Sequence, residues 1–262
     1  MKQRIQKLLA NAGVASRRHI EEMVREGRIA VNGRVVRSLP VLIDPDVDRV
    51  EVDGEAVRLR KALAGRRYYF LLNKPKGVYC TNVAQGEQVR AVDLLPRNVR
   101  ARLYPVGRLD ADSSGLLLLT NDGELTNRLT HPRYGIPRTY RVVVDGCVQP
   151  ETVDRLQEGV WLADKSGKGF KTGRCRVHVV RRDRQRSVLE ITLCEGRNRE
   201  VRRMLAKLGH KVRQLMRTRM GPLTIEGLSS GACRELTARE LRELRRAAGM
   251  DESAGEATDA HG

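Results

Sequence analysis

The sequence predicts an α+β protein in which a small N-terminal module precedes a larger domain with a mainly antiparallel mixed sheet. Two observations support this prediction. Short apolar strands and amphipathic helices follow one another without a strict alternating rhythm, and a polar, charged stretch at residues 57–67 separates two differently patterned regions. We therefore expect domains at 1–60 and 61–248, followed by an acidic tail at 249–262 that is unpatterned and disordered.

The first module reads as two helices and a hairpin. Apolar residues repeat at helical spacing before Gly13, and Ser16 is a typical N-cap for a second helix that ends at Gly27. Residues 29–36 then place an Asn-Gly pair between two β-branched runs, which is a strong hairpin signal. Up to Arg37 the module has nine Lys or Arg against three Glu, so its polar faces are basic.

The second domain alternates strand and helix signals. Four runs rich in apolar and β-branched residues predict strands at 68–72, 116–120, 139–144 and 187–193. Helical patterns occur at 124–130, at 198–208 and from Thr237, where Glu240 completes a capping box. Small and basic residues at 165–169 predict a loop.

Composition points to a polyanionic partner. The chain has 262 residues, a net charge of +18 and a pI near 10.4, which favours nucleic acid. No apolar run approaches the roughly 18 residues of a membrane span, and the N-terminus begins a charged helix, so we expect a cytoplasmic protein. Five cysteines without a C-x-x-C pair predict reduced, mostly buried thiols, and scattered histidines predict no metal site. We expect no cofactor.

The stretch from Gly107 to Gly115 is the most informative motif of the sequence. It holds Asp110 on a glycine-bounded turn directly before the apolar run Leu116 to Leu119. Asp, Ser and Gly are common in tight turns, so a purely local role is one interpretation. The other interpretation is that a rigid scaffold presents a reactive carboxylate there.

The first module resembles the S4 RNA-binding domain. The resemblance rests on the order of its elements, on Ala15-Ser16-Arg17-Arg18 at the start of the second helix and on Val31-Asn32-Gly33 in the hairpin. It implies that Arg17 and Arg18 bind RNA. The alternative is that these arginines are exposed to water on a helix surface and bind no RNA.

Four segments of the second domain resemble the RsuA branch of the ribosomal RNA pseudouridine synthases. They are Leu72-Asn73-Lys74-Pro75-Lys76-Gly77, Gly107-Arg108-Leu109-Asp110, Arg138-Thr139-Tyr140 and Glu195-Gly196-Arg197-Asn198-Arg199-Glu200-Val201-Arg202-Arg203-Met204. The last of them, with the later stretch 217–223, is most similar to the RluB type, which acts on large-subunit RNA. The resemblance covers nearly the whole chain to about residue 245.

This resemblance implies that Asp110 is the nucleophile of uridine isomerisation. An ionised carboxylate can form a covalent intermediate, but a closed pocket raises a carboxyl pKa unless a cation compensates. On a helix that starts at Asn198, Arg202 lies beside the apolar stripe, whereas Arg199 and Arg203 point farther out. Arg202, which the family also implies, is thus the expected active-site cation, and Arg199 and Arg203 are expected to meet phosphates. The alternative is three solvated arginines.

Three further residues receive roles from the resemblance. Tyr140 falls at the active-site tyrosine that stacks on the base, although a strand tyrosine is more often part of the core. Arg108 is implied to fill the space left by an extruded base, with a phosphate contact or a surface charge as the alternative. Lys74 lies on a turn expected to line the pocket and to contact RNA.

Two other classes of protein compete with this interpretation. A non-catalytic RNA-binding or ribosome-assembly factor would be expected to lack Asp110, Tyr140 or Arg202, yet all three are present. A magnesium-dependent phosphatase using Asp110 and Asp112 would need an apolar strand leading into the first aspartate, which is missing. We therefore expect a metal-free, monomeric enzyme acting on large-subunit ribosomal RNA, with small-subunit or another structured RNA as the alternative substrate.

Overall fold

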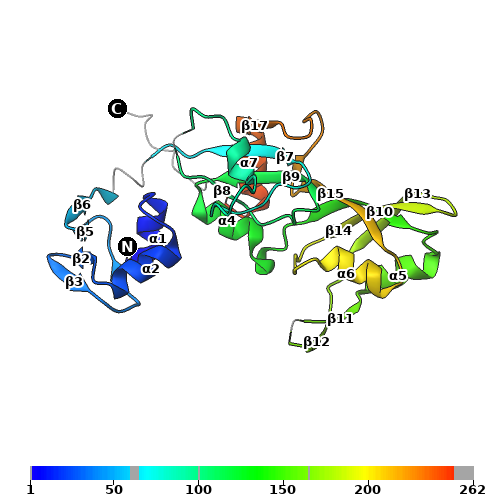
Figure 1. Cartoon of the computed structure of the whole chain (residues 1–262), viewed down its shortest axis with the longest axis horizontal. Helices are drawn as coiled ribbons and strands as arrows, with labels where there is room; N and C mark the ends of the chain where they lie inside the picture. The colour runs from blue at the N-terminus through cyan, green and yellow to red at the C-terminus, as the bar shows by residue number, and fades with distance from the viewer. Residues whose placement is uncertain (1, 60–64, 100, 165, 251–262) are drawn as a thin grey trace, which may run out of the picture. The chain divides into compact units, whose positions relative to one another are not determined.

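The computed structural model describes residues 2–59, 65–99, 101–164 and 166–250 (Figure 1). These residues form two compact units. One comprises residues up to Tyr68 with 101–102 and 121–123, and the other comprises the remaining described residues. Across the described part of the chain, no helix has the length and apolar character needed to cross a membrane.

The N-terminal unit packs two helices on a small sheet. Helix α1 (Ile5–Asn11) and helix α2 (Arg17–Arg25) precede strands β2 (Ile29–Val31), β3 (Arg34–Val36), β5 (Val50–Val52) and β6 (Glu55–Val57), ordered β3-β2-β5-β6. A second, two-stranded sheet joins β1 (Gln3–Arg4) to β4 (Leu42–Ile43). As predicted, Ser16 caps α2 by accepting a hydrogen bond from the His19 amide at 3.1 Å. The Asn32-Gly33 hairpin turn has positive φ at both residues.

A nine-stranded sheet organises the larger unit. Its main path is β13-β14-β10-β15-β9-β7-β17, with β16 beside β15 and β8 beside β9. The strands are β7 (Tyr69–Lys74), β8 (Tyr104–Pro105), β9 (Ser114–Thr120), β10 (Arg138–Asp145), β13 (Arg176–Arg182), β14 (Arg186–Leu193), β15 (Val212–Met220), β16 (Leu223–Thr224) and β17 (Cys233–Glu235). Among these pairs only β9 and β15 run parallel, which agrees with the predicted mainly antiparallel mixed sheet.

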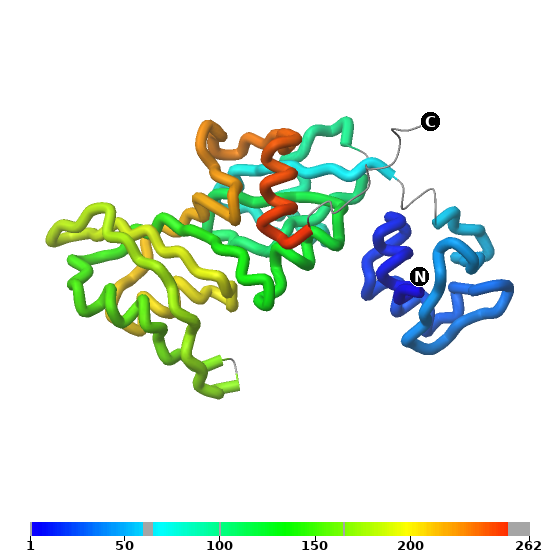
Figure 2. The backbone as a smooth tube through the Cα atoms, turned by 180° about the vertical axis from the view of Figure 1, so that it is seen from behind, coloured from blue at the N-terminus to red at the C-terminus, as the bar shows by residue number. Residues whose placement is uncertain are grey.

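Two hydrophobic cores lie on either side of this parallel pair. One packs β10 and β14 against α5 (Pro150–Glu158) and α6 (Glu200–Lys207). The other packs β7 and β9 against α4 (Gly123–Thr130) and α7 (Ala238–Ala247), and Figure 2 shows α7 in red against these strands. A short hairpin of β11 (Trp161–Ala163) and β12 (Gly169–Lys171) and two 3-10 turns (Ala91–Leu94 and Pro132–Tyr134) complete the unit. The β9–β15 pair therefore joins two halves of the domain, and a pocket opens at this junction.

Several sequence predictions need correction. The helix expected at 198–208 begins at Glu200, because Arg199 adopts a left-handed conformation with φ of 50°. Helix α5 and strand β15 were not predicted. The expectation of mostly buried cysteines is wrong, since only Cys175 is buried and Cys194 is exposed. Five residues of the expected linker 57–67, namely 60–64, and residues 251–262 of the expected tail lie outside the described residues. The linker, the disordered tail and the domain boundaries therefore stay predictions.

Candidate active site

Asp110 lies on a tight turn that leads into the buried strand β9. The Ser113 amide donates to the Asp110 carbonyl at 3.1 Å, and the Leu109 amide donates to the Cys80 sulfur at 3.4 Å. Ser113 and Leu109 are buried, whereas about a third of the Asp110 side chain stays exposed. Both interpretations of the motif therefore apply, because the residues form a turn and the turn presents a carboxylate.

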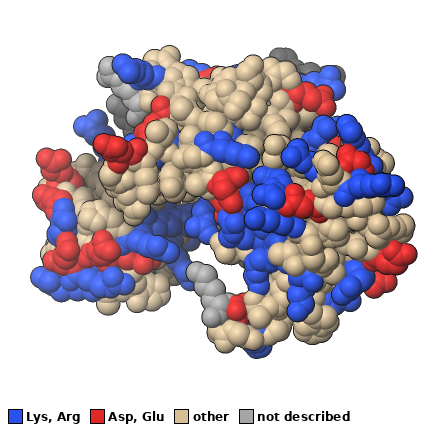
Figure 3. All heavy atoms as spheres, turned by 45° about the vertical axis from the view of Figure 1, so that its right-hand side comes forward, with Lys and Arg blue, Asp and Glu red and all other residues tan. Residues whose placement is uncertain are grey.

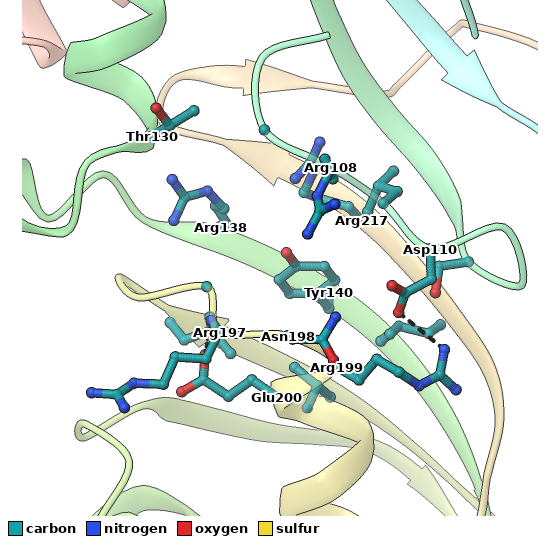
Figure 4. A pocket seen from close by; sticks show the side chains of 17 residues that line it. Arg108, Asp110, Thr130, Arg138, Tyr140, Arg197, Asn198, Arg199, Glu200 and Arg217 are labelled. Atoms are coloured by element: carbon teal, nitrogen blue, oxygen red, sulfur yellow. Dashed lines mark hydrogen bonds and ion pairs between the residues drawn. The ribbon is translucent and has the colours of Figure 1, made fainter. Parts of the chain in front are cut away.

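Arg199 is the cation that contacts Asp110. Its Nη1 lies 3.2 Å from Asp110 Oδ2 (Figure 4). Its guanidinium also donates to both oxygens of Asp112 at 3.2 and 3.1 Å. Arg199 is 43% exposed against 13% for Arg202, so it lies farther out than Arg202 as predicted. The prediction did not include its contact with Asp110. It assumed a helical backbone at residue 199, whereas the left-handed conformation before α6 turns this side chain toward the Asp110 turn.

Arg202 reaches the same turn but holds a different part of it. Its Nη2 donates to the Asp112 carbonyl at 3.1 Å and to Ser113 Oγ at 3.3 Å, and it lies 3.3 Å from Asp112 Oδ2. The side chain is 13% exposed, so it lies inward as predicted, although its carboxylate partner is Asp112 and not Asp110. Arg202 thus fixes the turn, and the prediction that it compensates the Asp110 charge directly is corrected.

The electrostatics of the turn keep Asp112 ionised. Partial burial raises the pKa of Asp112, but the hydrogen bond from Arg199 and the charges of Arg202 and Arg199 outweigh burial and hold that pKa below its usual value. The same pairing raises the pKa of Arg199. Two arginines and two aspartates therefore form a compact charged cluster at the start of β9.

Tyr140 forms a wall of the pocket next to this cluster. It lies on β10, is 9% exposed and lines a cavity of about 280 Å³ together with Asp110, Arg199 and Arg217 (Figure 4). This volume lies just below the range of about 300–1,000 Å³ that is typical of ligand pockets. The position of Tyr140 combines the two interpretations of the sequence, since the ring belongs to the core and also faces the pocket.

The predicted RNA-binding residues differ in accessibility. Arg17, Arg18 and Arg108 are exposed, and Arg108 lines the pocket. Lys74 is fully buried, and its ammonium donates to the carbonyls of Pro75 and Val78 at 2.9 and 2.8 Å. The prediction that Lys74 contacts RNA is therefore wrong for this conformation. All six residues of β7 are buried, Lys74 among them, and burial lowers the pKa of Lys74.

Arg203 is engaged away from the pocket. Its Nη2 donates to the Ala163 carbonyl of the β11–β12 hairpin, and its guanidinium lies 5.6 Å from the Phe170 ring centre. Arg197 stacks on the same ring at 4.1 Å. These contacts attach the hairpin to α6, so the expected phosphate contact of Arg203 stays a prediction.

Arg138, Glu200 and Arg217 also line the pocket. They belong to the segments quoted for the family resemblance, but no role was predicted for them. Glu200 is 4% exposed and accepts a hydrogen bond from the Arg197 amide, and burial raises its pKa to about 7. A signal for Arg217 exists in the sequence. It stands two residues after Leu215 in a strand, and this spacing places both side chains on the buried face.

Comparison with known proteins gives this site a class. The sequence model of the RNA pseudouridylate synthase family matches residues 68–207, and that of the S4 domain matches residues 3–45. The chain belongs to the RNA pseudouridylate synthase family and carries an N-terminal S4 domain. It is therefore an RNA pseudouridine synthase.

Individual relatives agree over nearly their full length. An uncharacterized RNA pseudouridine synthase of Aquifex aeolicus is 43% identical, with 95% of this chain and 96% of the relative aligned. Ribosomal large subunit pseudouridine synthase B of Bacillus subtilis is 42% identical over 93% and 96%, respectively. A crystal structure of a pseudouridylate synthase superposes with a TM-score of 0.66 at 30% identity, covering 92% of this chain and 99% of that one.

Proposed function

We propose that this enzyme isomerises uridine to pseudouridine in large-subunit ribosomal RNA, with Asp110 as the nucleophile. The observation that carries the proposal is the partly exposed Asp110 carboxylate, which Arg199 contacts in a pocket that Tyr140 also lines. The large-subunit substrate rests on the likeness to the Bacillus subtilis synthase.

The reaction conserves all atoms and electrons of the uridine. The N1–C1′ bond breaks, the base rotates and a C5–C1′ bond forms, while one proton leaves C5 and one is gained at N1. In our proposal an Asp110 oxygen bonds to C1′ as the base departs, and the carboxylate leaves again when C5 attacks C1′. Arg199 orients the carboxylate, and Arg202 keeps the turn in place.

Tyr140 suits the role of a base platform. Its ring is fixed by the packing of β10, so it costs little conformational freedom when a uracil stacks on it. We propose that Arg108, exposed two residues before Asp110, enters the RNA stack when the uridine leaves it. The S4 domain, with Arg17 and Arg18 exposed at the start of α2, would hold the RNA by phosphate contacts.

The magnesium phosphatase alternative loses support from the same geometry. Its acid would be Asp112, but both oxygens of this carboxylate are engaged by arginines. These cations also hold the pKa of Asp112 below its usual value, which makes this carboxyl a poor proton donor. The predicted independence of metal, the monomeric state and the cytoplasmic location stay predictions.

The test is pseudouridine mapping of unmodified ribosomal RNA transcripts incubated with the purified enzyme. We expect one or a few new sites in the large-subunit transcript and none in the small-subunit transcript. A new site only in the small-subunit transcript would overturn the proposed substrate and retain the reaction. New sites in neither transcript, nor in partly assembled subunits of either kind, would overturn the proposal for ribosomal RNA.

A further inference from the structure

We propose that Arg217 and Arg138 form a built anion site in the wall of the pocket, which binds a phosphate group flanking the target uridine. The inference rests on the proposed function and extends it to the substrate's backbone. The guanidinium groups of Arg138 and Arg217 are both buried. This is unusual, since arginine is almost never fully buried without a partner.

Arg217 is 2% exposed, yet its side chain makes one hydrogen bond to the described residues. Its Nε donates to the Leu116 carbonyl at 2.8 Å, whereas Nη2 is buried and has no hydrogen-bond partner there. A buried, charged donor without a partner is costly. An acceptor supplied by a ligand would therefore remove the cost of leaving Arg217 Nη2 unpaired.

Strand pairing places Arg217 beside the pocket. Arg217 on β15 pairs with Tyr140 on β10 and with Gly115 on β9, which follows the Asp110 turn. Directly opposite residues of an antiparallel pair share a face of the sheet, so Tyr140 and Arg217 project to the same side. In Figure 4 both line the hollow that also receives Asp110 and Arg138.

Arg138 adds a second buried charge. It is 9% exposed and donates to the carbonyls of Leu129 and Cys194 at 2.6 and 3.4 Å. These acceptors are neutral, and in the described structure no carboxylate forms an ion pair with Arg138 or Arg217. Burial lowers the pKa of Arg138, as expected for a cation that lacks a counterion.

The charge balance of the pocket selects an anion over a neutral group. Five of its described lining residues are arginines, and the only carboxylates among them are those of Asp110 and Glu200. Asp110 is already paired with Arg199. In Figure 3, Lys and Arg side chains, drawn in blue, are interspersed with Asp, Glu and other residues over the face shown. The RNA backbone carries one negatively charged phosphate at every nucleotide, whereas the uracil carbonyls are neutral. A phosphate therefore matches the excess of arginines in the pocket.

The test replaces a substrate charge and leaves the protein intact. RNA fragments containing the mapped target uridine are made with a single neutral methylphosphonate linkage, either 5′ or 3′ of that uridine. We expect one of the two to lower the single-turnover rate of the wild-type enzyme by about 10- to 100-fold, as for a lost charge-assisted hydrogen bond. Unchanged rates with both linkages would overturn the proposal.

Variants identify the arginine. Arg217→Met should slow the normal RNA by a similar factor but add little to the effect of the sensitive methylphosphonate, and Arg217→Lys should recover part of the rate. Equal loss on charged and neutral RNA would show that Arg217 binds the base or only supports the fold, and would overturn the assignment. Arg219→Met is the matched control, because Arg219 lies two residues farther along β15 with a 58% exposed side chain.

A binding measurement separates this proposal from the proposed function. Inorganic phosphate is titrated into the full-length wild-type protein while the NMR signal of the Arg217 Nε–H group is followed, with that of Arg219 as reference. A saturable shift confined to Arg217 would support the anion site even if no RNA were modified. Absence of a shift in excess phosphate would overturn the site even if the enzyme were active.

Discussion

Gly115 should be indispensable for joining the two halves of the catalytic domain. Its φ is 107°, and a Cβ placed there would lie 2.3 Å from the Arg217 carbonyl oxygen and 2.7 Å from the Arg217 amide nitrogen. Both contacts are with backbone, so β9 and β15 would have to separate by about 1 Å to reach ordinary contact distances. In Gly115→Ala, the positive φ costs about 1–2 kcal/mol, and loss of the Arg217 to Leu116 bond adds about 1.5–3 kcal/mol.

The expected total loss is about 2.5–5 kcal/mol of unfolding free energy. Thermal and urea unfolding followed by circular dichroism would measure it. Gly209→Ala is the matched control, because Gly209 has φ of 86° but no atom within 4 Å of the position that an added Cβ would take. It should lose only the conformational cost of about 1–2 kcal/mol. Equal losses in the two variants would refute the close approach of β15 to Gly115.

Three further predictions concern the charged cluster, a buried acid and the S4 domain. Arg199→Met should lower turnover about 100-fold, as for a nucleophile misplaced by 1 Å. Stability should change by less than about 1 kcal/mol because the pair is exposed. Arg239→Met, which removes an exposed arginine–glutamate pair on α7, is its control, and equal turnover in both variants would contradict the assignment. Glu200 has a folded pKa of about 7 against an ordinary 4.5, so folding favours its protonated form. The stability of the wild type relative to Glu200→Gln should thus be fullest below pH 4.5 and fall by up to about 3 kcal/mol as the pH rises through 7, which melting temperatures from pH 5 to 8 would check; a constant difference would refute it. Deleting residues 1–50 should weaken RNA binding and flatten its salt dependence by about 0.9 in log–log slope per lost phosphate contact, and an unchanged slope would contradict the role of the S4 domain.

The sequence predicted those elements whose signals are local. The cap at Ser16, the hairpin at Asn32-Gly33 and the capping box at Thr237 all form as expected, because each depends on neighbours within a few residues. Strand β15 was not predicted. Its pattern is interrupted by arginines, and its place in the sheet is set by long-range pairing with β9 and β10.

The same distinction explains the outcome at the site. The motif around Asp110 was visible as a glycine-bounded turn, and the pocket beside it brings in Tyr140. The assignment of cations failed because it assumed a helix from Asn198. Arg199 has a left-handed backbone conformation, and its side chain contacts Asp110. Arg202 instead pairs with the Asp112 carboxylate. Such a reversal depends on a single φ angle that periodicity does not encode.

The most direct test of the account compares Asp110→Asn with Asp112→Asn. Single-turnover pseudouridine formation is measured on the large-subunit transcript, together with RNA affinity at fixed salt. We predict that Asp110→Asn binds RNA as the wild type does and forms no product, whereas Asp112→Asn, which only loosens the turn, keeps measurable turnover. Product formation by Asp110→Asn at the wild-type rate would contradict the assignment of Asp110 as the nucleophile.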